Sequence, residues 1–171
     1  MERLWAPWRM EYIAAGSPEA RNDAAESTAG CVFCDAPRAE SDAASLIIAR
    51  GETCFVILNA FPYNNGHVMV VPFRHLARPA DLTGEENSEI MRTASALTAL
   101  LDGIYRPAGY NIGMNVGSAA GAGIAGHLHL HVVPRWSGDT NFMSVVGDIK
   151  VLPEMLDRTY TRLRDALANA L

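Results

Sequence analysis

The chain has 171 residues, enough for one domain with a substantial core and short for two. Apolar residues make up 49% of it and charged residues 19%, which excludes an intrinsically disordered protein. The net charge of -5 excludes the basic surface of a general nucleic-acid binder, so any anionic ligand must be held by a local site. The N-terminus carries charges where the apolar part of a signal peptide would run, and no apolar run is long enough to span a membrane. We therefore expect no nucleic-acid or membrane partner.

The sequence contains three cysteines, Cys31, Cys34 and Cys54. An odd number, with two of them paired as "CVFC", suits a reducing cytoplasm and a metal site better than a disulfide framework. Cys54 lies in an apolar run and is expected in the core. We therefore expect a cytoplasmic protein.

Three segments are expected along the chain. Residues 15–30 are rich in small and charged residues, so residues 1–30 are predicted to form an aromatic arm, with Trp5 and Trp8, and a flexible connection. Residues 31–136 are predicted to form the core of the domain. Residues 137–171 are predicted to be a C-terminal extension of the same domain that carries a helix. We expect the arm to pack on the domain or on a partner subunit.

Short runs rich in β-branched and aromatic residues predict strands at "SLIIAR" (45–50), "TCFVILN" (53–59), "HVMVVPF" (67–73) and "YNIGMNVG" (110–117). A long helix is predicted to begin near Thr83, because Glu86 stands three residues later in a capping-box spacing. Its predicted apolar face consists of Ile90, Met91, Ala94, Leu97, Leu101 and Ile104.

A second helix is predicted to start with Pro153 in its first turn. Its apolar side would carry Leu156, Tyr160, Leu163 and Leu167. Because strands and helices are segregated rather than alternating one for one, the sequence predicts an α+β fold. This fold would contain a mostly antiparallel five-stranded sheet and two main helices.

The stretch "GHLHLHVVPRW", residues 126–136, holds three of the five histidines of the chain. On one strand, His127, His129 and His131 would point to one face and the apolar residues between them to the other, with Pro134 marking the strand end. Aligned imidazoles need a common ligand to justify their desolvation. Two interpretations stay open, a metal site and an anion site in which one imidazole is the nucleophile.

A loop rich in glycine and alanine, "NVGSAAGAGIAG" (115–126), directly precedes these histidines. Its backbone can approach a ligand closely and present N–H groups to phosphate oxygens, so it favours a phosphate-bearing substrate. Separately, Cys31 and Cys34 call for a third and a fourth ligand if they bind zinc. His75 and one of the strand histidines could complete such a site, or the thiols could be structural.

The motif "HLHLHVV" resembles the histidine-triad (HIT) signature at all seven positions. The resemblance extends through "LNAFPYNNGHVMVVPFRH", "YNIGMNVG" and "CVFC". The stretches "LWAPWRMEYI" and "PRWSGDTNF" are similar to the bacterial diadenosine tetraphosphate phosphorylase-like or hydrolase-like branch. The resemblance implies a HIT fold and a homodimer whose sheets join. It also implies nucleotidyl transfer or hydrolysis at the α-phosphate of a dinucleoside polyphosphate.

The resemblance also implies residue roles. His129 would be the nucleophile, His131 would contact the phosphate or support the ring of His129, and His67 would belong to their hydrogen-bond network. The nucleotide would be bound by Leu58, Asn59, Asn115, Gly121 and Gly123. A structural zinc would be held by Cys31, Cys34, His75 and His127. A divalent cation such as Mg or Mn could accompany the substrate.

This sequence departs from the family pattern in the loop before the triad. The last loop positions lack the Ser, Thr or Gln of several branches, and Gly126 stands where an acidic residue is common. The sequence therefore leaves open whether water or inorganic phosphate accepts the nucleotidyl group. Two alternative functions stay open as well, a nucleoside phosphoramidate hydrolase like the Hint branch, and a nucleotide-binding regulator with little turnover.

Overall fold

The computed structural model describes residues 28–140 and 152–168. The predictions for the N-terminal arm, including Trp5 and Trp8, and for most of the connection lie outside these residues. The division of the chain into three segments stays a prediction.

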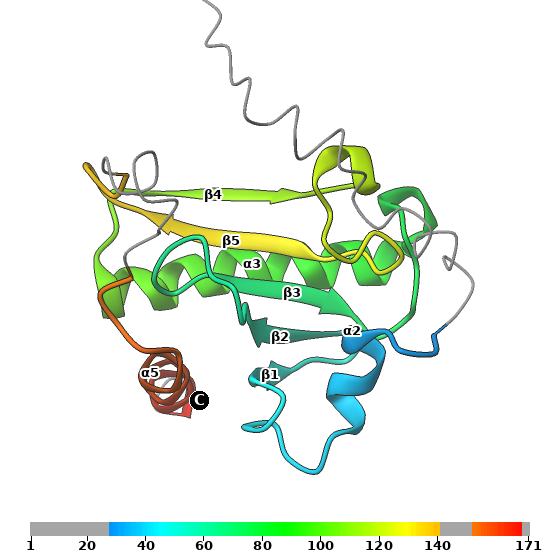
Figure 1. The fold of residues 1–171 in the computed structure, drawn as a ribbon, viewed down its shortest axis with the longest axis horizontal. Coiled ribbons are helices and arrows are strands. Elements are labelled where there is room, and N and C mark those ends of the chain that lie inside the picture. The colour runs from blue at the N-terminus through cyan, green and yellow to red at the C-terminus, as the bar shows by residue number, and fades with distance from the viewer. Residues whose placement is uncertain (1–27, 141–151, 169–171) are drawn as a thin grey trace, which may run out of the picture.

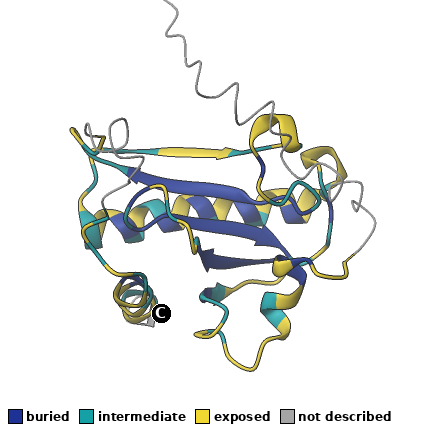
Figure 2. Ribbon diagram, viewed as in Figure 1, coloured by how far each residue is buried: buried dark blue, intermediate teal, exposed yellow. Residues whose placement is uncertain are grey.

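The described residues form one five-stranded antiparallel sheet, as predicted (Figure 1). Its strands lie in the order β1-β2-β3-β5-β4. They are β1 (Ile47–Arg50), β2 (Cys54–Leu58), β3 (Val68–Pro72), β4 (Gly109–Met114) and β5 (Leu130–Arg135). The central strands β2 and β3 are buried throughout, which explains why their sequences are continuous apolar runs (Figure 2).

Different helices pack on the two faces of the sheet. Val56 and Val70 pack toward α3 (Gly84–Tyr105) and α5 (Leu156–Ala168), in a core that also contains Leu130 and Val132 of β5. On the opposite face, Phe55, Ile57, Met69 and Val71 pack with the short helix α2 (Val32–Asp35) and with Cys31. The alternation along each strand thus separates a helix-packing face from the face on which α2 lies.

Helix α3 begins as the sequence predicts. The Glu86 backbone N–H donates to Thr83 Oγ1 at 3.1 Å, and the Thr83 N–H donates to Glu86 Oε2 at 2.8 Å. The predicted apolar face is buried at Ile90 and its helical neighbours, but Met91 is 53% exposed. The assignment of Met91 to this face was wrong, because one position after Ile90 the helix has already turned about 100° away from the sheet.

Helix α5 begins at Leu156, so the prediction that Pro153 lies in its first turn was wrong. The segment before the helix is held instead by Glu154, whose carboxylate accepts hydrogen bonds from Tyr105 Oη at 2.5 Å and Thr159 Oγ1 at 2.8 Å. The predicted apolar side is confirmed: Leu163 is buried in the core, and Leu156, Tyr160 and Leu167 pack against it. No helix in the described ranges combines the length and apolar character required to cross a membrane.

Strand β5 starts later than predicted, at Leu130, so His127 and His129 precede it rather than lying within it. The reason is a change of partner: the N–H of Leu128 donates to the carbonyl of Leu76 at 2.6 Å, beyond the end of β3. Pro134 also does not end the strand, since β5 continues to Arg135 and pairs with β4 up to that residue.

Candidate active site and metal centre

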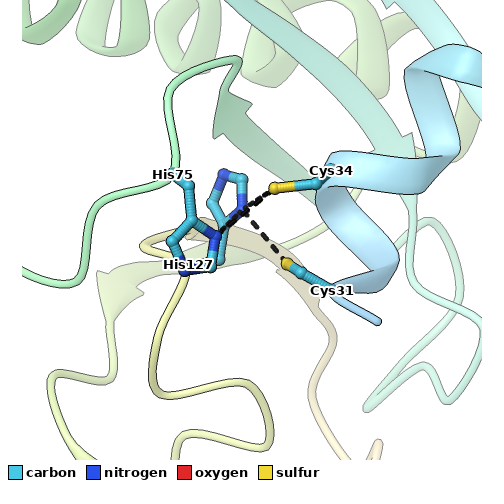
Figure 3. A group of neighbouring side chains, drawn as sticks. All are labelled: Cys31, Cys34, His75 and His127. Carbon is cyan, nitrogen blue, oxygen red and sulfur yellow. Dashed lines mark hydrogen bonds between the residues drawn. The ribbon is translucent and has the colours of Figure 1, made fainter. Parts of the chain in front are cut away.

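Four predicted metal ligands lie together beside the end of the sheet (Figure 3). Cys31 directly precedes α2 and Cys34 lies within it, while His75 comes from the segment after β3 and His127 from the segment before β5. The Nδ1 atom of His127 lies 3.3 Å from Cys31 Sγ, 3.5 Å from Cys34 Sγ and 3.3 Å from His75 Nδ1. Cys34 Sγ lies 3.3 Å from His75 Nδ1.

These separations fit one shared ion. Tetrahedral zinc with ordinary bond lengths places two nitrogen ligands about 3.3 Å apart and a nitrogen and a sulfur about 3.6 Å apart. The Nε2 atom of His127 lies 2.9 Å from the carbonyl oxygen of Pro72, which can only accept, so the proton is on Nε2 and the Nδ1 lone pair faces the cluster. Burial and the neighbouring Cys31 thiol raise the pKa of Cys34 to about 11. The cluster can hold a metal ion, which would supply the positive charge that keeps such thiols deprotonated.

His129 carries its proton on the other ring nitrogen than His127 does. Its Nδ1 atom lies 2.8 Å from the carbonyl oxygen of His127, so this nitrogen carries the proton. Burial lowers the pKa of His129, which keeps the ring neutral near pH 7. The Nε2 atom of His129 is therefore an unprotonated nitrogen with an available lone pair.

His131 and His67 form a hydrogen-bonded pair. The backbone N–H of Tyr63 donates to His67 Nδ1 at 3.0 Å, so His67 carries its proton on Nε2 and donates it to His131 Nδ1 at 2.9 Å. Burial lowers the pKa of His67 to about 3 and that of His131 to about 4, so both rings are neutral near pH 7. The proton of His131 is then on Nε2, a buried atom with no hydrogen-bond partner among the described residues.

A pocket of about 770 Å³ opens beside these histidines. It brings together most of the residues predicted for nucleotide binding and catalysis, namely Leu58, Asn59, Asn115, Gly121, Gly123, His129 and His131. His67 lies behind this pocket, in contact with His131. The remainder of the lining is mainly apolar and includes Val32, Phe33, Ala36, Leu46, Ile57, Phe61 and Met69.

Sequence reasoning missed two aromatic residues of this site. Phe33 packs on His127 and His129, with ring centroids 5.5 and 5.0 Å apart, and Tyr63 lies 5.6 Å from His131 in a stacked arrangement. The position of Phe33 between the paired cysteines was the available signal. Fold and site together define an α+β protein with a histidine-lined pocket beside a Cys/His cluster that can hold a metal ion.

Comparison with known proteins identifies the family. The sequence profile of the HIT domain matches residues 40–138. AP-4-A phosphorylase of Mycobacterium tuberculosis is 41% identical over 159 residues, which cover 93% of this chain and 80% of that protein. The chain therefore belongs to the HIT domain family.

A second curated relative and a solved structure are also similar to this chain. A bis(5'-nucleosyl)-tetraphosphatase (asymmetrical) of Schizosaccharomyces pombe is 28% identical over 95 residues, 56% of this chain and 52% of that protein. The crystal structure of a Zn-bound histidine triad family protein from Mycobacterium smegmatis matches with a TM-score of 0.67 and 28% identity, covering 84% of this chain and 97% of that chain. The predicted fold class and the prediction of a HIT-family enzyme are confirmed.

Proposed function

We propose that this protein cleaves dinucleoside polyphosphates of the diadenosine tetraphosphate type at the α-phosphate, with His129 as the nucleophile. The observation that carries the proposal is the orientation of His129: Nδ1–H is held by the His127 carbonyl, and the residue lines the pocket with its Nε2 lone pair available. A neutral imidazole is a good nucleophile and a good leaving group. The names of the relatives in Mycobacterium tuberculosis and Schizosaccharomyces pombe support this substrate class.

The reaction would proceed in two displacements. In the first, His129 Nε2 bonds to the α-phosphorus while the P–O bond to the leaving nucleotide breaks, which gives nucleotidyl-His129. In the second, an acceptor oxygen attacks the same phosphorus, the P–N bond breaks, and His129 is restored. With water as the acceptor, diadenosine tetraphosphate gives AMP and ATP; with inorganic phosphate it gives ADP and ATP.

The paired histidines would assist both displacements. His131 presents an Nε2–H that is buried and lacks a protein partner in the described chain, so we assign it to a non-bridging oxygen of the attacked phosphate. A donor that is already oriented toward developing negative charge stabilises the transition state without reorganisation. His67 would hold His131 in the required tautomer.

The pocket offers different chemistry to different parts of a nucleotide. We assign the apolar side, with Leu58 and Phe33, to the base, and Asn59 to the ribose hydroxyls. Asn115, Gly121 and Gly123 lie on the side of the pocket formed by the loop before the histidines, and we assign them to the phosphates. A divalent cation such as Mg or Mn would neutralise part of the polyphosphate charge as it binds.

The Cys/His cluster would hold zinc. The donor set of two thiols and two imidazole nitrogens, with distances that fit a tetrahedron, supports this metal, as does the Zn-bound relative of Mycobacterium smegmatis. Four protein ligands leave no open coordination position, so a zinc here would act structurally. Cys31, Cys34 and His75 would fix His127, whose carbonyl in turn orients His129.

We also propose that the protein forms a homodimer through β4. Within the described chain, β4 is an edge strand, and its Ile112 is 46% exposed. The opposite edge, β1, is partly covered, because Tyr160 Oη donates to the Ile47 carbonyl at 3.1 Å. Arg164 donates to the Ile48 carbonyl at 3.1 Å. An edge strand with free backbone groups is suited to pairing with a second copy.

We place this enzyme in the cytoplasm, where its thiols would stay reduced.

The test is incubation with diadenosine tetraphosphate, with and without inorganic phosphate, with products separated by chromatography. ADP that appears only when phosphate is present would indicate phosphorolysis, and ATP plus AMP would indicate hydrolysis. If neither product pair forms, the proposed function is wrong. A nucleoside phosphoramidate substrate would then be tested in the same assay, and nucleotide binding without turnover by equilibrium binding.

A further inference from the structure

The loop between β2 and β3, residues 59–67, is tied to the strand that carries His131. Its anchor is Asn64, which is 6% exposed. The Asn64 side-chain amide donates to the carbonyl of Pro134 at 3.1 Å and to Asp139 Oδ2 at 2.7 Å. Pro134 lies on β5, and Asp139 lies just after that strand. One buried side chain thus joins the loop to the C-terminal end of β5.

Asp139 is itself held firmly. Arg135 Nε donates to Asp139 Oδ2 at 2.6 Å and Arg135 Nη2 donates to Oδ1 at 2.9 Å, while the N–H of Trp136 donates to Oδ2 at 3.1 Å. The carboxylate side chain is only 8% exposed. Charge-assisted bonds of this bidentate type have fixed geometry, so they present Asn64 with an acceptor at a defined position.

Asn64 also shapes the inner side of the loop. Its backbone carbonyl accepts the N–H of His67 at 3.2 Å, across a turn in which Gly66 has a φ of +71°. The neighbouring residue, Tyr63, directs its backbone N–H to the Nδ1 atom of the His67 ring at 3.0 Å. The position of this N–H therefore depends on where Asn64 holds the loop.

Two donors lie near His67 Nδ1: the side-chain amide of Asn59 at 3.4 Å and, closer at 3.0 Å, the backbone N–H of Tyr63. The Tyr63 N–H, as the closer donor, sets the proton positions of two rings. Because it donates to His67 Nδ1, the His67 proton must be on Nε2, where it is given to His131 Nδ1. His131 then carries its own proton on Nε2, toward the pocket. If the Tyr63 N–H moved away, His67 could shift its proton to Nδ1. His131 would then protonate Nδ1 to keep the contact, and its Nε2 lone pair would face the phosphate oxygens.

We infer that Asn64 is a positioning residue for the reaction. Through the backbone N–H of Tyr63, it fixes which nitrogen of His67, and consequently of His131, carries the proton. The catalytic meaning of this arrangement rests on the proposed function, but the tautomers themselves can be observed whether or not the protein cleaves dinucleoside polyphosphates.

The experiment compares the full-length wild type with Asn64→Ala, and with Thr159→Ala as a matched control. Thr159 is a buried polar residue of α5 that does not contact the histidines, so its loss destabilises the fold without touching the loop. Long-range nitrogen–proton NMR of protein labelled with ¹⁵N-histidine reports the tautomer of every ring. Turnover of diadenosine tetraphosphate is measured in parallel, with kcat and KM determined separately.

In the wild type and in Thr159→Ala, we expect a protonated Nε2 on both His67 and His131. In Asn64→Ala, we expect a second His67 tautomer with Nδ1 protonated, and a kcat lowered by about 10- to 100-fold with KM changed by less than about threefold. If Asn64→Ala does not fold, Asn64→Ser carries the same comparison, since its hydroxyl can satisfy only one of the two acceptors.

A folded Asn64 variant with the wild-type tautomers would overturn the inference, whatever its activity. The same tautomer change in Thr159→Ala would overturn it too, because the effect would then be one of general destabilisation. Absence of turnover in the wild type, with the tautomers changed only in the Asn64 variant, would instead refute the proposed function and leave the positioning role of Asn64 supported.

Discussion

The Cys/His cluster and the histidine-lined pocket each contain an imidazole, and the two rings present opposite nitrogens. His127 and His129 are two residues apart, yet His127 directs Nδ1 to the cysteines and His129 keeps Nε2 for the pocket. The difference comes from the carbonyl that each ring meets: Pro72 takes the Nε2–H of His127, and His127 itself takes the Nδ1–H of His129. The role of a histidine is thus decided by the acceptor that holds its proton.

The two regions are also linked through one residue, His127, whose ring lies in the cluster and whose backbone carbonyl contacts His129. The His127 ring belongs to the Cys/His cluster, and the backbone carbonyl oxygen of His127 lies 2.8 Å from His129 Nδ1. A substitution of a cluster residue should therefore disturb the orientation of His129, whereas a substitution of His129 should leave the cluster unchanged. This asymmetry can be tested by mutation.

The largest effect is expected for His129→Ala. Turnover should fall by about a thousandfold or more, because the nucleophile is lost, while nucleotide binding and metal content remain unchanged. Chromatography of the products, equilibrium binding of a nucleotide and elemental analysis measure the three quantities. Retained turnover would contradict the role of His129, and a loss of metal would contradict the asymmetry.

The cluster is tested by Cys34→Ser, with Cys54→Ala as the control cysteine outside the cluster. Protein purified without added zinc should contain about one zinc per chain in the wild type and in the control, and much less in Cys34→Ser. Turnover of Cys34→Ser should fall by about 10- to 100-fold, because the His127 carbonyl loses its support. A metal-free wild type with full thermal stability would show that these thiols are merely core residues.

The buried pair of His67 and His131 should make the free energy of unfolding depend on pH. Burial lowers the pKa of His67 to about 3 and that of His131 to about 4, from 6.5. The unfolded chain therefore takes up protons below pH 6.5 that the folded chain resists. The stabilisation is complete above that pH and is lost as the pH falls toward about 4 for His131 and toward about 3 for His67.

At pH 5, each of these rings should reduce the free energy of unfolding by about 2 kcal/mol relative to pH 7. His67→Gln, which cannot be protonated, should lose one such contribution and show a flatter acid limb in urea unfolding. An identical pH dependence in wild type and variant would show that His67 is not held neutral by burial.

The smallest effects are expected for two glycines of the pocket, where one substitution should change stability and the other KM. Gly121 has a φ of +84°, so Gly121→Ala should cost about 1 kcal/mol of stability, measured by urea unfolding. Gly123 is not among the glycines with positive φ, and a Cβ there would meet no atom within 4 Å. Gly123→Ala should change stability by less than about 0.5 kcal/mol but raise KM, because its methyl group would face the phosphates. An unchanged KM would remove Gly123 from the phosphate site.

The sequence was sufficient to predict the sheet and the long helix, because these depend on local patterns. β2 and β3 are continuous apolar runs, and Thr83 with Glu86 forms the capping box that the spacing predicts. The start of β5 could not be predicted, because it depends on the distant carbonyl of Leu76, which takes the N–H of Leu128. Tertiary pairing of this kind leaves no local signal.

The candidate site shows the same division. Residue types and the family resemblance brought the four metal ligands into one set, and the structure places them together. The ring nitrogen that each histidine offers depends on backbone acceptors and donors far along the chain, such as Pro72 for His127 and Tyr63 for His67. The role inferred for Asn64 had no sequence signal, since its partners Pro134 and Asp139 meet it only in the folded protein.

The most direct test of nucleophilic attack by His129 is the stereochemical course at the α-phosphorus. A dinucleoside polyphosphate made chiral at that phosphorus with sulfur and oxygen isotopes would be converted by the enzyme, and the configuration of the product determined. Each in-line displacement inverts the phosphorus, so two displacements through nucleotidyl-His129 predict overall retention. Inversion would contradict the covalent intermediate, because it would mean that the acceptor attacks the substrate directly.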